Sequence, residues 1–335
     1  MAQKVFVTGA TGFVGKHLVK ALSQRGDEIL CLVRATSNRK PLELPGVRFV
    51  EGDIRKAETM VEAIEEADIV FHVAAFLKAP WMEAFKTINI DGTDNVARVC
   101  AEAKNPPILV VVSTLAAAGP LDTLTPRTEE QPVAPISIYG QTKLQAEEKA
   151  RSYADRVPTT IVRPPGVFGD GDPSFSKLFG LIQKGWHVVS GRKGQKMSMI
   201  HVADLADALI RAATDGERIP KEPTPEQSGQ GVYYIAHDQA ASFAELGQYL
   251  GKALGKKRVW IIHIPKFIFW SLAFISESMG RLRKKPAVLN LDKAKEAFGG
   301  NWICSTEKAK KQLGFKAQAT LQGRLQETIQ NHLQK

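Results

Sequence analysis

Tyr139 and Lys143 are the residues whose types and spacing most directly suggest chemistry. They lie four positions apart in the segment YGQTK, so a helix would place both side chains on one face. A free tyrosine, with a pKa near 10, exchanges protons poorly at neutral pH, but a neighbouring ammonium group stabilises the phenolate. The pair therefore predicts an acid–base tyrosine that acts on a substrate oxygen, with an ordinary surface pair as the alternative.

Ser113 and Thr114 add hydroxyl groups at the end of an apolar run, ILVVVST, which predicts a strand over residues 108–114. The helix that carries the tyrosine is expected over residues 136–154, and a further strand over 159–164. Because the carboxyl ends of parallel strands meet at one edge of a sheet, we expect a hydroxyl group to hold the substrate oxygen beside Tyr139.

A glycine-rich loop, TGATGFVG, follows the strand expected over residues 4–9 and opens a helix expected over 14–25. Gly9 at the turn can adopt a positive φ, Gly12 lets backbone N–H groups approach a diphosphate, and Gly15 allows the helix to pack closely on the strand. The order strand, loop and helix favours a dinucleotide site over an ordinary turn. The predicted contacts in this loop are Gly9, Thr11, Gly12, Phe13 and Val14.

The end of the second strand, expected over residues 28–34, bears on which dinucleotide binds. NAD sites usually place an acidic residue there to hold the ribose 2′-hydroxyl, whereas this chain has Arg34. An arginine can bind a 2′-phosphate, with Ser37, Arg39 or Lys40 as neighbours, so the sequence favours NADP(H) over NAD(H). The alternative is that Arg34 is simply an exposed residue at a strand end.

The third strand, expected over residues 48–53, ends at Asp53. Its carboxylate is a candidate acceptor for the adenine amino group, with Ile54 beside it in the predicted cofactor site. A role in a turn or as a helix cap is the alternative for Asp53.

Strands and helices alternate through the first two thirds of the chain, which predicts an α/β fold with a parallel sheet and helices on both faces. We expect a dinucleotide-binding core over residues 1–165, joined by a returning strand and helix near 197–215. Residues 166–335 are expected to form mostly a smaller, largely helical substrate-binding lobe. Further strands are expected at 68–75, and further helices at 59–66, 82–103, 242–254 and 320–333.

Seven segments resemble, in order, the motifs of the extended short-chain dehydrogenases/reductases: TGATGFVG, VFHVAA, NIDGT, VVVSTLAAAGP, YGQTK, RPPGVFGDGD and MIHVADLADA. The resemblance extends over essentially the whole chain and is most specific in residues 4–210. It implies a doubly wound Rossmann fold, a nicotinamide dinucleotide and a Ser/Thr–Tyr–Lys triad. It makes Tyr139 the acid–base residue, Lys143 the residue that holds the nicotinamide ribose, and Thr114 the catalytic hydroxyl.

The same resemblance assigns supporting residues. Ser113 is expected against the cofactor, and is the neighbouring alternative for the catalytic hydroxyl. Asn89 matches an asparagine near the active site, or else braces the backbone. His201 and Asp204 are expected to be structural. Further cofactor contacts are implied at Ala74, Ala75, Pro164 and Val167.

Three functions are compatible with these motifs. The first is an oxidoreductase that transfers hydride between a nicotinamide and a lipophilic secondary alcohol or ketone, similar to dihydroflavonol reductases and 3β-hydroxysteroid dehydrogenases. The second is a nucleotide-sugar epimerase, against which Arg34 argues, because epimerases usually retain NAD. The third is a non-catalytic dinucleotide-binding scaffold, which is disfavoured because Tyr139 and Lys143 are both present. Sugar dehydratases carry an Asp–Glu pair where this chain has Leu115 and Ala116, so dehydration is disfavoured.

The composition is that of an ordinary globular protein of 335 residues, with 44% hydrophobic and 24% charged residues, which excludes a disordered or fibrous chain. Its 3 cysteines are widely spaced and suggest neither a disulfide framework nor a metal site. No signal peptide and no apolar run long enough to span a membrane is evident, so we expect a cytoplasmic protein. No nucleic-acid-binding module is evident either.

The net charge of +10 is concentrated in residues 252–285, which hold nine basic residues and one acidic residue around the apolar run PKFIFWSLAFI at 265–275. An apolar helix with basic flanks is typical of a segment that lies on an anionic membrane surface, here the inner face of a membrane. A helix that covers the substrate pocket, or a subunit contact in a homodimer, is the alternative.

Overall fold

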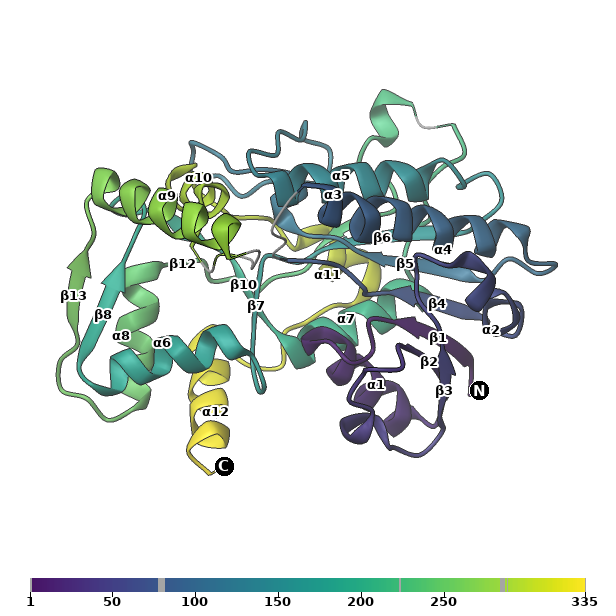
Figure 1. Ribbon diagram of the computed structural model, residues 1–335, viewed down its shortest axis with the longest axis horizontal. Helices are drawn as coiled ribbons and strands as arrows, with labels where there is room; N and C mark the ends of the chain where they lie inside the picture. The colour runs from purple at the N-terminus through teal and green to yellow at the C-terminus, as the bar shows by residue number, and fades with distance from the viewer. Residues whose placement is uncertain (1, 78–81, 223, 284–286, 288, 335) are drawn as a thin grey trace.

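A computed structural model describes residues 2–77, 82–222, 224–283, 287 and 289–334. Seven parallel strands form its central sheet in the order β11-β6-β5-β4-β1-β2-β3 (Figure 1). The first strand lies inside the sheet and the chain winds outward from it in both directions, which is the doubly wound Rossmann arrangement. This confirms the predicted fold class. The strands are β1 (Lys4–Thr8), β2 (Glu28–Val33), β3 (Val47–Glu51), β4 (Ile69–His72), β5 (Ile108–Val112), β6 (Thr159–Arg163) and β11 (Val232–Tyr234).

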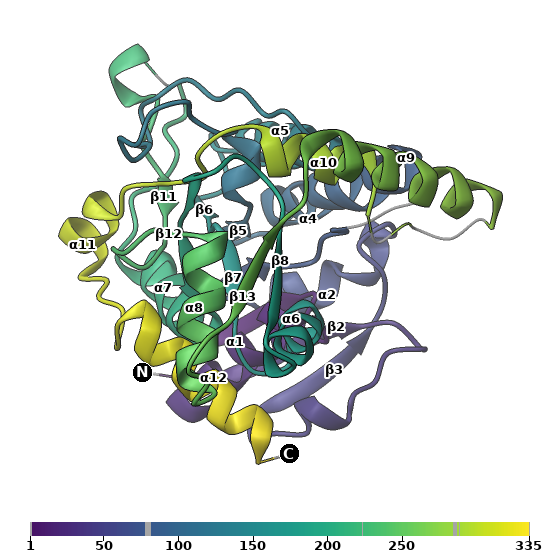
Figure 2. The same cartoon turned by 90° about the vertical axis from the view of Figure 1, so that its left-hand side faces the viewer.

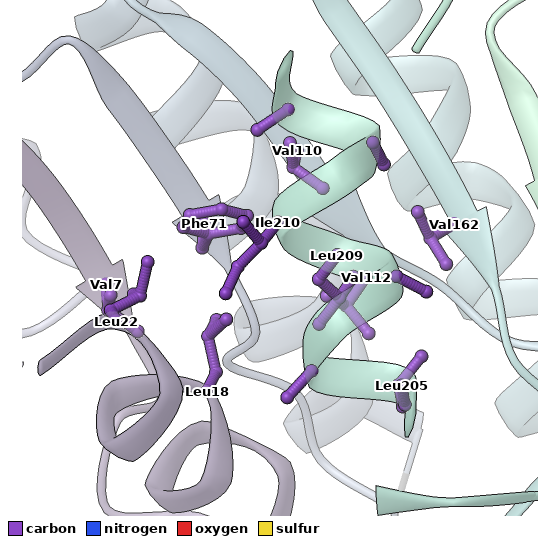
Figure 3. Packing of buried hydrophobic residues seen from close by; sticks show 14 of the residues in the cluster. Val7, Leu18, Leu22, Phe71, Val110, Val112, Val162, Leu205, Leu209 and Ile210 are labelled. Atoms are coloured by element: carbon purple, nitrogen blue, oxygen red, sulfur yellow. The ribbon is translucent and has the colours of Figure 1, made fainter. Parts of the chain in front are cut away.

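One face of the sheet is covered by α1 (Phe13–Arg25), α7 (Val202–Thr214) and α11 (Glu307–Leu313). Figure 3 shows Leu18 of α1, Ile210 of α7 and Phe71 of β4 in one buried cluster. Burial of one such large aliphatic side chain contributes about 1.5–3 kcal/mol, so this layer holds α1 and α7 firmly on the sheet.

The opposite face is covered by α2 (Val61–Glu65), α4 (Asp91–Glu102) and α5 (Ile138–Arg151). The single helix expected over residues 82–103 is divided into α3 (Met82–Phe85), a π-helical turn (Lys86–Ile90) and α4. The turn contains Asn89, and such π-turns are often found at functional sites.

The returning segment of the core differs from the prediction in one element. The helix near residue 197 is present as α7, but the strand there, β10 (Met199–His201), pairs with β7 (Gly166–Phe168) and not with the central sheet. The seventh strand is instead β11, which pairs with β6. The strand that follows β6 in the chain, β7, pairs with β10 outside the central sheet. The free edge of β6 is therefore taken by a later strand, β11.

A second, smaller unit lies to one side of the core and is mostly helical (Figures 1 and 2). The Asp204 carboxylate of α7 forms a buried ion pair with Arg324 of this unit, with the closest atoms 2.5 Å apart. The pair attaches the unit to the sheet, which confirms the structural role expected of Asp204. The remaining elements of this unit are α6 (Pro173–Gln183), β8 (Trp186–Val189), β9 (Lys196–Met197), β12 (Ala241–Ser242), α8 (Phe243–Ala253), β13 (Trp260–His263), α9 (Lys266–Leu282), α10 (Leu291–Phe298) and α12 (Leu321–Leu333).

Candidate active site

Thr114 and Tyr139 meet at the carboxyl end of β5. The Thr114 hydroxyl oxygen accepts a hydrogen bond from the Ala116 backbone N–H at 3.2 Å, which fixes the turn after the strand. Its side chain also lies close enough to the Tyr139 phenol to act on the pKa of that group. The hydroxyl and the phenol line the same cavity, and their joint action on one substrate oxygen stays a prediction.

Gly140 allows this arrangement. A Cβ atom at this position would lie 2.3 Å from the Ala116 carbonyl oxygen, so any larger residue would push α5 away from the turn that carries Thr114. The helix begins beside this contact, where the Ser137 hydroxyl accepts a hydrogen bond from the Gly140 N–H at 3.0 Å. The glycine of YGQTK thus has a steric reason, which the sequence alone does not reveal.

Lys143 lies one helical turn beyond Tyr139 and is almost completely buried, with 1% of its surface exposed. Its Nζ atom donates a hydrogen bond to the Val112 carbonyl oxygen at 2.9 Å. Burial lowers the pKa of this ammonium group to about 8, although the Glu147 carboxylate opposes the shift. The lysine can therefore titrate near physiological pH.

The pKa of Tyr139 differs from the sequence argument, which expects the ammonium group to lower it. In the chain alone, burial raises the pKa of the phenol, and the nearby Glu296 carboxylate raises it further. The nearby Thr114 hydroxyl acts in the opposite direction and lowers the pKa. Exclusion of water is therefore the dominant effect, and without ligands the phenol stays protonated at neutral pH.

Ser113 points its hydroxyl at a different partner. It donates a short hydrogen bond to the buried Glu147 carboxylate, which also accepts two hydrogen bonds from Arg163 at 2.6 and 2.9 Å. Although burial acts to raise the pKa of Glu147, the Arg163 charge keeps it below its ordinary value. The Ser113 hydroxyl thus belongs to a buried network under the site. Sequence reasoning missed Glu147, although its spacing of four residues from Lys143 could have indicated it.

A cavity of about 210 Å³ lies along the glycine loop. Gly9 has a φ of 71°, and a Cβ atom there would lie 2.6 Å from the Ala74 nitrogen. No side chain caps the start of α1 at Gly12, so backbone N–H groups of its first turn face the loop. This cradle fits the diphosphate of a dinucleotide. The described lining is Gly9, Thr11, Gly12, Leu32, Arg34, Ser37, Gly52, Asp53, Ile54, Val73, Ala74, Ala75, Phe76 and Ile88.

Seven predicted cofactor residues lie outside this lining: Ser113, Tyr139 and Lys143, which are described above, and Phe13, Val14, Pro164 and Val167. Phe13 and Val14 are the first residues of α1, and the Pro164 carbonyl oxygen accepts a hydrogen bond from Leu115 N–H at 2.8 Å. Val167 packs partly buried against the core cluster. Their contacts with a cofactor stay predictions.

Buried side chains fix the loop around Ala74. The Ala74 N–H donates to the Thr8 hydroxyl at 3.3 Å, and that hydroxyl lies 2.8 Å from His72 Nδ1. On its other side, His72 Nε2 lies 2.9 Å from the Thr93 hydroxyl, which donates to the Asn89 carbonyl oxygen at 2.6 Å. Burial lowers the pKa of His72 to about 3, so the ring is neutral, with its proton on Nε2.

Asn89 connects that loop to the catalytic helix. Its side chain exchanges hydrogen bonds with the Phe76 backbone at 2.8 and 3.2 Å and donates to the Thr142 hydroxyl at 3.3 Å. The bracing role left open for Asn89 by the sequence is therefore present in the structure.

The far end of the same cavity is bordered by Arg34 and Ser37. The Arg34 backbone N–H donates to the Ser37 hydroxyl at 3.1 Å, and no carboxylate in the described chain lies within ion-pair distance of its guanidinium. Arg39, the other arginine nearby, pairs with Glu51 at 2.8 Å. Arg34 is thus the better placed of the two arginines to meet an anion.

Asp53 also lines this end, and its carboxylate binds the Arg55 guanidinium at 2.6 and 3.0 Å. The hydrogen bond from Arg55 holds the pKa of Asp53 below its ordinary value, so the group is ionised.

A second cavity, of about 500 Å³, is lined by Thr114 and Tyr139 and opens between the core and the smaller unit. Apolar residues of its wall include Leu115, Met197, Phe243, Phe269 and Trp302, and α10 adds Lys293 and Glu296. The Asp292 carboxylate, on the same helix, accepts hydrogen bonds from the Ile138 and Tyr139 N–H groups at 2.8 and 3.2 Å. Sequence reasoning missed these three α10 residues, because the segment has only an ordinary amphipathic pattern.

Helix α9 covers this cavity with one face, through Phe269, and leaves another face exposed.

None of the helices in the described ranges is both long enough and apolar enough to cross a membrane. Within the same ranges, no group of three or more His, Cys, Asp and Glu residues could hold a metal ion. Lys284 and Lys285, two of the basic residues of the 252–285 segment, lie outside the described residues.

A family model described as the NAD dependent epimerase/dehydratase family matches residues 5–226. The chain belongs to this family. It is an NAD(P)-dependent oxidoreductase of the extended short-chain type, as the sequence predicts.

Relatives are similar over most of the chain. Short-chain dehydrogenase/reductase family 42E member 1 from Homo sapiens is 28% identical, over 94% of this chain and 84% of its own. Ceramide reductase from Caulobacter vibrioides is 29% identical, over 90% of this chain and 86% of its own. Sterol-4-alpha-carboxylate 3-dehydrogenase, decarboxylating, from Dictyostelium discoideum is 24% identical, over 93% and 96%.

Solved structures support the fold. The crystal structure of dTDP-glucose 4,6-dehydratase from Bacillus anthracis in complex with NAD superposes with a TM-score of 0.76, at 21% identity, and covers 100% of this chain and 97% of that one.

Proposed function

We propose that this protein transfers hydride between NADP(H) and a lipophilic secondary alcohol or ketone. The observation that supports the proposal is that the Thr114 hydroxyl and the Tyr139 phenol lie together in the wall of the large cavity. An acid–base group and a hydroxyl on one oxygen are what carbonyl reduction requires beside a nicotinamide.

The residues divide the work as follows. The nicotinamide supplies or accepts the hydride. Tyr139 gives its proton to the substrate oxygen in reduction, or takes it in oxidation, while Thr114 holds that oxygen by a hydrogen bond. Lys143 extends from α5 towards the sheet, where its ammonium group donates to the Val112 carbonyl oxygen. Its charge also lowers the pKa of His72 on β4, so the two side chains are near each other. From this position it can hold a ribose hydroxyl and stabilise the phenolate electrostatically.

The preference for NADP(H) rests on Arg34, whose guanidinium borders the cofactor cavity together with Ser37. A 2′-phosphate there would gain a charge-assisted hydrogen bond from the guanidinium, which is stronger than the neutral hydrogen bond that a 2′-hydroxyl would form with it. The similar solved structure is in complex with NAD, so the preference for NADP(H) rests on Arg34 alone.

The substrate class follows from the wall of the large cavity. Phenylalanine, leucine, methionine and tryptophan side chains predominate there, which suits a lipophilic body better than a sugar nucleotide. Named relatives that act on sterols and ceramide support the same class. A sugar diphosphate, the ligand of the epimerase alternative, carries two negative charges, whereas Lys293 is the one basic residue in the described wall and Glu296 is paired with it.

We further propose that α9 rests on an anionic membrane surface. Its exposed side chains include Phe267, Phe274 and Leu282, which are 72%, 61% and 86% exposed. Trp186 and Trp260 stack beside each other on the neighbouring β8–β13 pair, and Arg258 lies over Trp260. An apolar face with aromatic and basic neighbours is typical of interfacial segments. If two copies docked through this face, their basic flanks would repel each other. The expected homodimer would therefore use another surface, and it stays a prediction.

The experiment that tests the function compares wild type with Tyr139→Phe. We expect NADPH-dependent reduction of a long-chain ketone such as dodecan-2-one, and a loss of about 10²–10⁴-fold in kcat in the variant with NADPH affinity retained. Equal activity in both proteins would remove Tyr139 from the mechanism. Tyr153→Phe is the matched control, because Tyr153 is a partly exposed tyrosine just beyond the C-terminal end of α5.

A further inference from the structure

Lys293 and Glu296 are the charged residues in the described wall of the large cavity. Lys293 Nζ lies 2.5 Å from Glu296 Oε2 and 5.9 Å from the centre of the Tyr139 ring. The pair is therefore held beside the group that protonates the substrate, on an otherwise neutral wall.

The pair has unused hydrogen-bonding capacity. Glu296 Oε1 is buried and accepts no hydrogen bond from any residue in the described part of the chain. The Lys293 ammonium carries three donors, and its contact with Glu296 uses one. A buried carboxylate oxygen without a donor is costly, since its desolvation is not compensated, so a ligand that supplies a donor there gains affinity.

Contacts with the core fix the position of the pair. The Glu296 carbonyl oxygen accepts a hydrogen bond from Trp302 Nε1 at 2.9 Å, and Asp292 on the same helix binds the start of α5. The distance between the pair and the Tyr139 phenol is therefore set by the fold, and so is the place on a substrate that the pair can reach.

We infer that Lys293 and Glu296 form a specificity site for a second, neutral polar group of the substrate, a hydroxyl or secondary amide close to the reacting carbon. This inference rests on the proposed function. Such a group donates to Glu296 Oε1 and accepts from Lys293 Nζ at once. A carboxylate can accept from Lys293, but it offers no donor to Glu296 Oε1 and is repelled by the Glu296 charge. A plain hydrocarbon also leaves Oε1 without a donor, so both are discriminated against.

The test uses four ketones of matched chain: dodecan-2-one, 1-hydroxydodecan-2-one, N-(2-oxododecyl)acetamide and 3-oxododecanoate. With NADPH, we expect wild type to prefer the hydroxy or the amido ketone to dodecan-2-one by about tenfold or more in kcat/KM, and to disfavour the carboxylate. The two neutral probes distinguish a hydroxyl from an amide as the recognised group.

Glu296→Gln and Lys293→Met should each reduce that preference to within about twofold of unity. Because any change in the Tyr139 pKa affects all the ketones alike, the ratio of rates isolates recognition from proton transfer. Lys295→Met is the matched control, because Lys295 is an exposed residue of the same helix. A ratio that is the same in wild type and both variants overturns the inference.

A binding measurement separates this inference from the proposed function. Calorimetric titration of the NADP-loaded protein with dodecane-1,2-diol and dodecan-2-ol should show tighter binding of the diol, lost in Glu296→Gln. If no ketone is reduced but the diol retains this Glu296-dependent advantage, the proposed function fails and the specificity site stands. If dodecan-2-one is reduced and neither neutral group improves rate or binding, the specificity site fails and the function stands.

Discussion

The Asp292 carboxylate accepts a hydrogen bond from the Tyr139 backbone N–H at 3.2 Å, although 153 residues separate the two in the chain. The same carboxylate accepts from the Ile138 N–H at 2.8 Å. A negative charge on the first N–H groups of a helix stabilises that helix. The smaller unit therefore supports the catalytic helix at the turn where the acid–base residue lies.

Asp292→Ala should consequently weaken both the fold and the reaction. We expect a loss of about 1 kcal/mol in the free energy of unfolding, typical of a removed helix cap, and a fall of about tenfold in kcat as Tyr139 loses its fixed position. Urea unfolding and steady-state kinetics measure the two effects, and NADPH affinity should change less than kcat. Asp122→Ala removes an 88% exposed carboxylate and serves as the control. Equal kcat in the two variants would show that Asp292 does not position the tyrosine.

Lys143 should make stability depend on pH. Burial lowers its pKa from 10.5 to about 8, so between these values the unfolded chain holds a proton that the native protein has released. Stability then rises with pH, with a slope from this group of at most about 1.4 kcal/mol per pH unit. Below pH 8 the native protein also carries the charge, so the slope from this group vanishes and the full destabilisation by the buried ammonium is present.

The measurement is the difference in unfolding free energy between wild type and Lys143→Met, taken from pH 7 to 10 without cofactor. We expect this difference to change in favour of wild type as the pH rises through 8. The exposed Lys295→Met should show a constant difference, and a constant difference for Lys143→Met would contradict the burial of a charged lysine.

Arg34→Asp should reverse the cofactor preference. The arginine is expected to bind the 2′-phosphate of NADP(H), whereas an aspartate accepts from the 2′-hydroxyl of NAD(H) and repels the phosphate. We expect the ratio of Kd values for NADH and NADPH to change by about a hundredfold, as measured by fluorescence titration. Arg39→Asp should change it far less, because Arg39 is paired with Glu51. Tighter binding of NADH than of NADPH by wild type would refute the preference.

Phe274→Glu should release the protein from anionic membranes. The substitution places a charge in the exposed face of α9, where we propose that apolar side chains enter the headgroup region. Sedimentation with vesicles of phosphatidylglycerol and phosphatidylcholine should fall several-fold, and high salt should weaken wild-type binding in the same assay.

Leu333→Glu is the matched control for this prediction, since Leu333 is 57% exposed at the end of α12, away from α9 in Figure 1. Wild type that stays in the supernatant at low salt, or equal release by both variants, would contradict the membrane face.

The sequence by itself determined six of the seven strands of the sheet, the glycine loop and the candidate group Thr114, Tyr139 and Lys143. These depend on local patterns: continuous apolar strands, glycines at a strand–helix turn, and a four-residue spacing on one helix. Such patterns act within one or two elements, so they can be recognised without knowledge of the rest of the chain.

Only the tertiary structure decided what surrounds that group. Asp292, Lys293 and Glu296 reach the site because α10 packs over the start of α5, and nothing in their local sequence indicates this contact. The Ser113 hydroxyl and the Arg163 guanidinium both donate hydrogen bonds to the Glu147 carboxylate. These residues come from the end of β5, from β6 and from α5, which meet only in the folded core. The direction of the Tyr139 pKa likewise depends on burial, which is a property of the packed protein and not of the YGQTK segment.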